Sequence, residues 1–202
     1  VGIMVFGKRT AIHQGFFDNI GESARQIGLA LRSHDVGAGT SINSAVVDAA
    51  EYMKTHLQGS PGRRAILIVT DDLGINYRLP DQKVIRALES ADAVLDAIVT
   101  GRAIRPAPPA PGHYANPDFT PADVFLLAEK TGGQAIRSDR TGDSLREMIE
   151  SIRARYSLSY HVPGGAPSGS FRKIEVQLSM LARKRYPNAL LQYRTGYYVP
   201  GS

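Results

Sequence analysis

The sequence contains no cysteine among its 202 residues, and this absence excludes several kinds of site at once. A chain without cysteine forms no disulfide, no thiolate zinc site and no cysteine nucleophile. The cellular compartment stays open on this evidence, because exported bacterial proteins can also lack cysteine.

Long hydrophobic runs and common catalytic motifs are absent as well. No apolar stretch approaches the roughly 18 residues that a membrane-spanning helix needs. The 5 histidines form no H-E-x-x-H motif, and no Gly-x-Ser-x-Gly elbow marks a serine hydrolase. Because the sequence assembles no nucleophile, base and orienting group, we expect a protein without catalytic turnover.

The charge balance is basic, with a formal net charge of +5, while 43% of the residues are hydrophobic. That hydrophobic content excludes extensive disorder. The excess of arginine and lysine lies in the part of the chain from Arg137 onward, but no run there interleaves these cations with aromatic residues in a nucleic-acid-binding motif. The composition therefore predicts a globular chain and argues against nucleic-acid binding.

Strand and helix signals alternate through residues 1–155 and predict one α/β domain. The extended stretches are Val1–Phe6, Thr10–Phe17, Arg64–Thr70, Ala93–Thr100 and Gln134–Ser138, and helices are expected to start near Asn19, Ser41, Pro80, Thr120 and Asp143. Arg64–Thr70 is apolar on both faces, so we expect an inner parallel strand, with Val1–Phe6 parallel to it and Thr10–Phe17 antiparallel at an edge. This order predicts a Rossmann-like, doubly wound, mostly parallel sheet.

The pattern changes at Tyr156. Three alternating, β-rich stretches follow without a helix between them, at Tyr156–Val162, Phe171–Met180 and Leu190–Val199. Residues 156–202 are therefore predicted to form a small antiparallel β extension. The proline-rich segment Gly101–Phe119 is expected to be a surface loop within the first domain.

Two features are predicted to meet at the carboxyl edge of the sheet. The glycine loop Gly37–Ser41 opens a helix, and Asp71 and Asp72 end the strongest strand. Ligands bind at this edge in open α/β sheets, and hydroxyl and carboxylate oxygens suit Mg²⁺ or Mn²⁺. The residues alone leave open a second interpretation, in which Thr40 and Ser41 only cap the helix and Asp71 only ends the strand.

Several short motifs occur in a specific order, and they cover nearly the whole chain. They are "GAGTSINSAVVDAA" from Gly37, "RRAILIVTDD" from Arg63, "LAEKTGG" from Leu127, "YSLSY" from Tyr156, "RKIEV" from Arg172 and "RTGYY" from Arg194. The ordered set resembles a von Willebrand factor type A (VWA) domain, and most of all a bacterial VWFA-related family.

The resemblance implies an adhesion-type, protein-binding module with a metal-ion-dependent adhesion site. Thr40 matches the family's metal-binding threonine and Asp71 its strand-end aspartate, while Asp72 stands where the family has glycine. The family's D-x-S-x-S motif lies on a first, central strand that this chain lacks and that would precede Val1, as in an N-terminally truncated domain. Mg²⁺ or Mn²⁺ is therefore expected to bind weakly or not at all to this chain.

The same resemblance implies a protein partner whose acidic side chain completes the metal coordination, and it favours a location outside the cytoplasm. Two other functions stay open. One is a Mg²⁺-dependent Rossmann-like or receiver-like enzyme using Asp71 and Asp72, although the sequence shows no receiver set with a strand-end lysine. The other is an interaction fragment that binds no metal.

Overall fold

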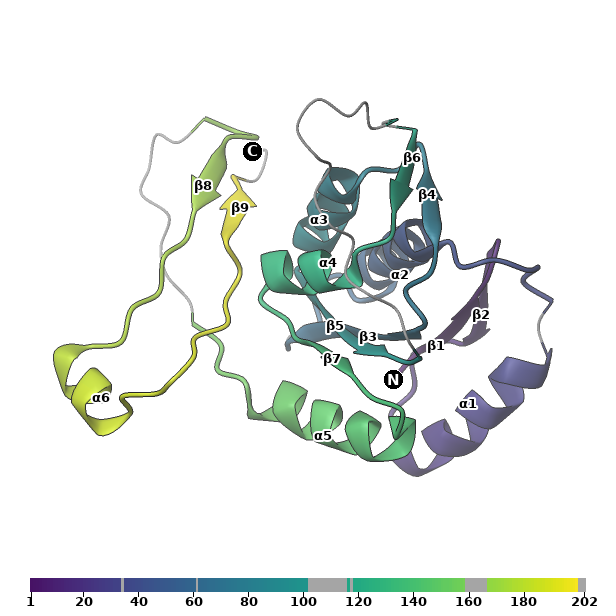
Figure 1. Cartoon of the computed structure of the whole chain (residues 1–202), viewed down its shortest axis with the longest axis horizontal. Helices are drawn as coiled ribbons and strands as arrows, with labels where there is room; N and C mark the ends of the chain where they lie inside the picture. The colour runs from purple at the N-terminus through teal and green to yellow at the C-terminus, as the bar shows by residue number, and fades with distance from the viewer. Residues whose placement is uncertain (34, 61, 102–115, 117, 159–166, 200–202) are drawn as a thin grey trace.

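The computed structural model describes residues 1–33, 35–60, 62–101, 116, 118–158 and 167–199 (Figure 1). Its main sheet is parallel and contains, in spatial order, β3 (Arg64–Thr70), β5 (Ala93–Val99) and β7 (Ala135–Arg137). The helices around it are α2 (Ile42–His56), α3 (Asp81–Ser90), α4 (Val124–Thr131) and α5 (Thr141–Ala154). In Figure 1, α2, α3 and α4 lie on one side of this sheet and α5 lies on the other. The chain therefore has the mixed α/β architecture that the alternating signals predict.

Strand β5 is the centre of the core. Ala93, Leu95 and Ala97 are completely buried, and α3 and α4 pack their own buried side chains into the same cluster. Asp96 interrupts this apolar run and is also completely buried. The guanidinium of Arg155 donates hydrogen bonds to both Asp96 carboxylate oxygens, one of them at 2.8 Å. A buried carboxylate is tolerated in this strand because a cation neutralises it.

The prediction that Arg64–Thr70 lies inside the sheet is wrong. Strand β3 is parallel to β5, as expected, but within the described residues it has no strand on its other side. Ile68 is buried, whereas Val69 is 42% exposed. That Val1–Phe6 runs parallel to this strand stays a prediction, and β1 (Ile3–Phe6) is hydrogen-bonded to β2 (Thr10–Gln14). An apolar strand at an edge leaves part of its surface uncovered.

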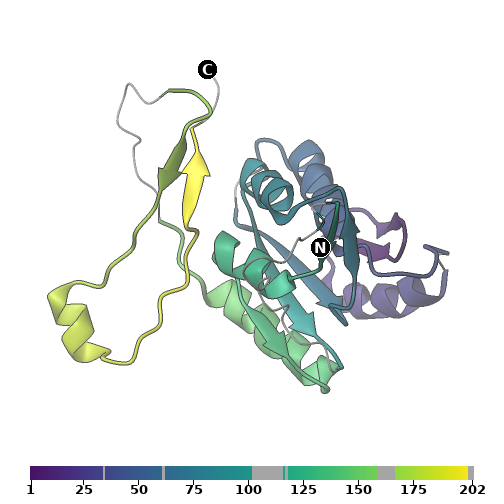
Figure 2. The same ribbon diagram turned by 45° about the horizontal axis from the view of Figure 1, so that its top comes forward.

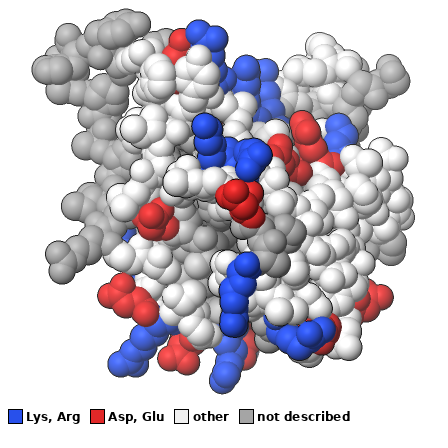
Figure 3. All heavy atoms as spheres, turned by 90° about the vertical axis from the view of Figure 1, so that its right-hand side faces the viewer, with Lys and Arg blue, Asp and Glu red and all other residues white. Residues whose placement is uncertain are grey.

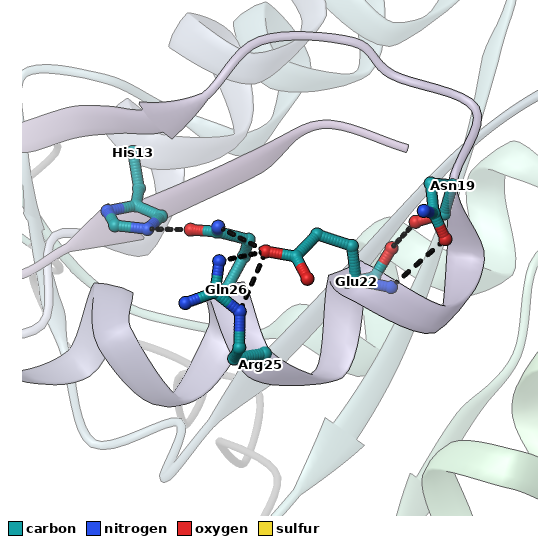
Figure 4. A network of polar contacts seen from close by, with 6 residues as sticks. His13, Asn19, Glu22, Arg25 and Gln26 are labelled. Atoms are coloured by element: carbon teal, nitrogen blue, oxygen red, sulfur yellow. Dashed lines mark hydrogen bonds and ion pairs between the residues drawn. The ribbon is translucent and has the colours of Figure 1, made fainter.

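The N-terminal segment forms an antiparallel pair, as predicted, between β1 and β2 (Thr10–Gln14), with α1 (Ile20–Ser33) packed against it. The predicted helix start near Asn19 is confirmed, since α1 begins at Ile20 and the Glu22 amide donates to Asn19 Oδ1 at 3.2 Å. Figure 4 shows how polar side chains then join α1 to β2. Gln26 bridges Glu22, at 2.7 Å, and the His13 ring, at 2.9 Å. This polar bridge fixes the helix beside the hairpin.

A second short antiparallel pair, β4 (Ile75–Tyr77) with β6 (Phe119–Pro121), lies beside α2 in Figure 1. The prediction that a helix starts at Thr120 is wrong, because Thr120 pairs with Asn76 in this sheet. Helix α4 starts after Asp123, whose side chain accepts a hydrogen bond from the Leu126 amide at 2.9 Å. The helix ends at Gly132, which adopts the left-handed conformation with φ 81°.

Residues 167–199, here called the C-terminal arm, contain β8 (Phe171–Lys173), α6 (Met180–Arg185) and β9 (Gly196–Tyr198). The predicted antiparallel pairing is found between β8 and β9, outside the main sheet. The prediction that no helix separates these stretches is wrong, because α6 lies between β8 and β9, with Ser179 capping it by accepting from the Ala182 amide at 3.2 Å. The observed strands are therefore shorter than the predicted ones. Residues 156–158 are not in a strand, and 159–162 lie outside the described residues.

The base of the arm is attached to the α/β body by polar contacts. Arg194 forms an ion pair with Asp92 at 2.8 Å, and Arg86 Nε donates to the Tyr198 hydroxyl at 3.2 Å. The Thr195 amide donates to the Lys130 carbonyl at 3.4 Å. The division at residue 155 stays a prediction, and these contacts show that the arm is anchored on α3 and α4.

Candidate functional site

The loop before α2 and the loop after β3 pack directly against each other at the carboxyl end of β3. An added Cβ at Gly74 would lie only 2.0 Å from the Thr40 carbonyl oxygen, so any side chain there would force the two loops apart. The Thr40 loop is also held from the other side, where the Ser41 amide donates to the Gly7 carbonyl at 3.0 Å. The structure therefore brings together the two segments that the sequence assigned to one edge.

The two predicted ligand residues lie in different surroundings. Thr40 is half-buried between its neighbouring loops, whereas Asp71 is exposed and its Oδ1 accepts a hydrogen bond from the Leu73 amide at 3.3 Å. Ser41 occupies the N-cap position of α2, but its side chain makes no capping hydrogen bond. The interpretation in which Ser41 only caps the helix therefore lacks the hydrogen bond that it requires.

Asp72 is the residue of this edge that sequence reasoning underestimated. Its backbone has φ 53°, in the left-handed region, and the residue is only 5% exposed. Its Oδ1 accepts a hydrogen bond from the Val124 amide at 3.3 Å, while Oδ2 is buried without a hydrogen-bond partner among the described residues. The sequence held a signal for this, because Asp72 stands where the resembled VWA motif has glycine, a residue that adopts a positive φ freely.

Burial gives the Asp72 carboxyl an unusual affinity for a proton. Desolvation raises its pKa from 3.8 to about 6, and the negative charges of Asp123 and Asp71 act in the same direction. The hydrogen bond from the Val124 amide opposes this rise. Burial therefore holds the pKa of Asp72 above that of an ordinary surface aspartate.

A small polar pocket of about 210 Å³ lies beside the first turn of α2. Its lining includes Ser41, Asn43, Ser44, Asn76, Tyr77 and Leu79. Asn43 is 1% exposed, and its Nδ2 donates to the Leu79 carbonyl at 2.8 Å and to Asp81 Oδ1 at 2.9 Å. Its Oδ1 has no partner among the described residues. Ser41 and Ser44 contribute hydroxyl groups to the lining of this pocket.

The donor chemistry at this edge fits a hard divalent cation, but the number of donors is small. Thr40, Asp71 and Asp72 present only oxygen atoms, which Mg²⁺ and Mn²⁺ prefer. In the part of the chain that the structure describes, no three His, Cys, Asp or Glu side chains gather closely enough to hold a metal. An ion at this edge would therefore keep most of its water ligands.

The charged surface adds no alternative site on the face that Figure 3 shows. On that face Lys and Arg side chains alternate with Asp and Glu, and no region carries one sign alone. A nucleic-acid-binding face would present a continuous basic patch. None of the helices in the described ranges has both the length and the apolar character that a membrane crossing requires.

Comparisons with known proteins give a likeness of fold. No protein family and no curated protein matches the chain. An aerotolerance-related membrane protein from Bacteroides fragilis NCTC 9343, with multiple mutations to serines, aligns with 76% of this chain and 79% of its own, at 17% identity and a TM-score of 0.54. The conserved hypothetical protein BatB from Bacteroides thetaiotaomicron aligns over the same shares at 17% identity, with a TM-score of 0.50. The chain therefore resembles these aerotolerance-related and BatB proteins in its α/β fold.

Proposed function

We propose that this chain is a Rossmann-like, VWA-like module that binds a protein partner at the carboxyl edge of β3. The observation that carries the proposal is the direct packing of the Thr40 loop on the Asp71–Gly74 loop. This packing supports the proposal, because the two loops, far apart in the sequence, carry the Thr40 hydroxyl and the Asp71 carboxylate. The likeness to BatB proteins supports the fold on which the proposal depends.

Thr40 and Asp71 would hold Mg²⁺ or Mn²⁺ weakly at this edge. A bound cation would supply an open coordination position that an acidic side chain of the partner can occupy. Thr40 would orient the ion from one loop, and Asp71, which is exposed, would approach it from the other. Asp72 contributes negative charge from below the surface, where Oδ2 is free of hydrogen bonds among the described residues.

The surroundings of the two aspartates favour this function over phosphoryl chemistry. A receiver-like or phosphatase-like site needs carboxylates that act together on one phosphoryl group and one metal. Here Asp71 is exposed, whereas Asp72 is buried and bound to the first turn of α4. One exposed and one buried carboxylate suit a ligand-binding edge better than a catalytic site.

Calorimetric titration with Mg²⁺ and with Mn²⁺ tests the metal step. We expect weak binding, with a dissociation constant of about 1 mM, because few protein oxygens replace water. Asp71→Ala should abolish this heat, whereas Asp139→Ala, at another exposed aspartate, should leave it unchanged. Tight binding that survives Asp71→Ala would place the metal elsewhere and contradict the assignment.

The partner step needs a separate measurement. Arrays of Glu- and Asp-containing peptides, each beside its Gln or Asn counterpart, can be probed with the labelled protein in Mg²⁺ or in chelator. The proposal predicts that acidic peptides are retained only with Mg²⁺ and that Thr40→Ala and Asp71→Ala weaken retention. Equal retention of acidic and amide peptides would show that a carboxylate is not what the edge recognises.

A further inference from the structure

The tip of the C-terminal arm consists of α6 and its flanking residues, up to Leu191. It stands away from the α/β body in both ribbon views, while the base of the arm is held against the body (Figures 1 and 2). Helix α6 buries none of its residues. The tip is therefore free to contact something other than its own domain.

Large apolar side chains dominate the surface of this tip. Met180 is 82% exposed, Leu181 is 81% exposed and Leu190 is 93% exposed, so their side chains lie almost wholly in solvent. Tyr186, which is 55% exposed, lies directly after the helix. Aliphatic side chains in this number at the end of an extended arm indicate a contact surface rather than a stray exposed residue.

Cations lie among these apolar residues. Arg183, Lys184 and Arg185 follow one another in the last turn of α6, and no acidic residue occurs between Gln177 and Val199. Arg183 is turned back toward the arm, where it donates to the Leu178 carbonyl at 3.0 Å and to Gln177 Oε1 at 3.2 Å. The guanidinium of Arg185 lies 5.5 Å from the centre of the Tyr186 ring.

We propose that the tip of the arm binds the surface of an anionic lipid membrane. Leucine and methionine side chains insert into the boundary between headgroups and acyl chains, and tyrosine is favoured at the headgroup level. Lysine and arginine at the same level attract negatively charged lipids. The tip combines these groups within 12 residues, from Met180 to Leu191, with no acidic residue to oppose them.

The same composition argues against other occupants. Nucleic acid would match the cations but would leave Leu181 and Leu190 without apolar contact. A second copy of the tip would cover the apolar side chains but would bring two like-charged clusters together. An anionic membrane satisfies both features, so charge complementarity selects it.

Flotation with lipid vesicles tests the proposal on the full chain. Vesicles of phosphatidylcholine containing about one third phosphatidylglycerol should carry the protein upward, and pure phosphatidylcholine should carry about tenfold less. Binding should fall as salt is raised, since surface attraction is screened. Lys184→Glu with Arg185→Glu, and separately Leu181→Ser with Leu190→Ser, should each lower the bound fraction at least about fivefold.

A matched pair of charge reversals on the body, Arg140→Glu with Arg146→Glu, is the control and should leave flotation close to that of the parent. Circular dichroism should show that the tip variants stay folded, because they remove no buried side chain. The proposal is overturned if tip and control variants float equally, or if neutral vesicles bind as well as anionic ones. It is also overturned if vesicles bind nothing while light scattering shows a dimer that Leu181→Ser with Leu190→Ser abolishes.

Discussion

Replacing Asp72 with asparagine should change how the stability of this protein depends on pH. The side chain keeps its shape, its carbonyl oxygen can still accept from the Val124 amide, and asparagine tolerates the positive φ of this position. Only the titratable charge is removed. The difference in unfolding free energy between variant and parent therefore isolates the buried carboxyl.

The sign follows from the direction of the shift. The pKa of Asp72 is raised in the folded protein, to about 6 from an ordinary 3.8, so the folded state retains a proton that the unfolded state releases. The parent is consequently destabilised as pH rises between these two values. A displacement of about two pKa units corresponds to about 3 kcal/mol at most. The variant keeps one unpaired polar group in place of Oδ2, so we expect a net gain of about 1–2 kcal/mol above pH 7.

Urea unfolding at a series of pH values from 4 to 8 measures this effect. The stability difference between Asp72→Asn and the parent should be small near pH 4, grow up to about pH 6 and then level off. Asp71→Asn removes the same charge from an exposed neighbour and serves as the control. A difference that is flat across the series would refute the argument, because it would mean that burial does not favour the protonated form of Asp72.

Two further predictions concern the core and the junction of the loops. Arg155→Met leaves Asp96 completely buried without its cation, so the free energy of unfolding at pH 7 should fall by about 3–5 kcal/mol. The double variant Arg155→Met with Asp96→Leu should recover most of that loss. Equal instability of the single and double variants would contradict the role of the ion pair. Gly74→Ala drives a methyl group against the Thr40 carbonyl, so it should lower the free energy of unfolding by about 2 kcal/mol and weaken Mg²⁺ binding. The control is Gly142→Ala, where an added Cβ meets no atom within 4 Å, and it should be nearly neutral in thermal unfolding.

The helices could be predicted from the sequence because their boundaries are set by residues inside or next to them. Asn19 accepts a hydrogen bond from the Glu22 amide at the start of α1, and Gly132 ends α4 in the left-handed conformation. Both signals act within one turn of helix, so neighbouring residues are enough to read them. The same locality misled at Thr120, where pairing with Asn76 of β4 prevails over the tendency to start a helix.

Burial of strands and side chains depends on partners that are distant in the sequence, so the sequence alone predicted it less well. The composition of Arg64–Thr70 is that of an inner strand, yet Val69 is 42% exposed, because no described strand covers the second edge of β3. Asp71 and Asp72 are chemically identical in the sequence. Only the backbone turn at Asp72 decides which carboxylate is buried and which faces solvent.

Two ion pairs hold the chain where it leaves the body toward the arm and where it returns, and their two aspartates lie close together in the sequence. Arg155, at the C-terminal end of α5, holds Asp96 within β5, and Arg194, near the end of the arm, holds Asp92 just before β5. The tip is thus part of a loop that is clamped at both ends to one short segment. A protease that cuts after Lys184 or Arg185 would leave the short C-terminal fragment held by the pairing of β9 with β8 and by the Arg194–Asp92 ion pair, so the nicked chain should keep its mass in solution and separate only under denaturing conditions.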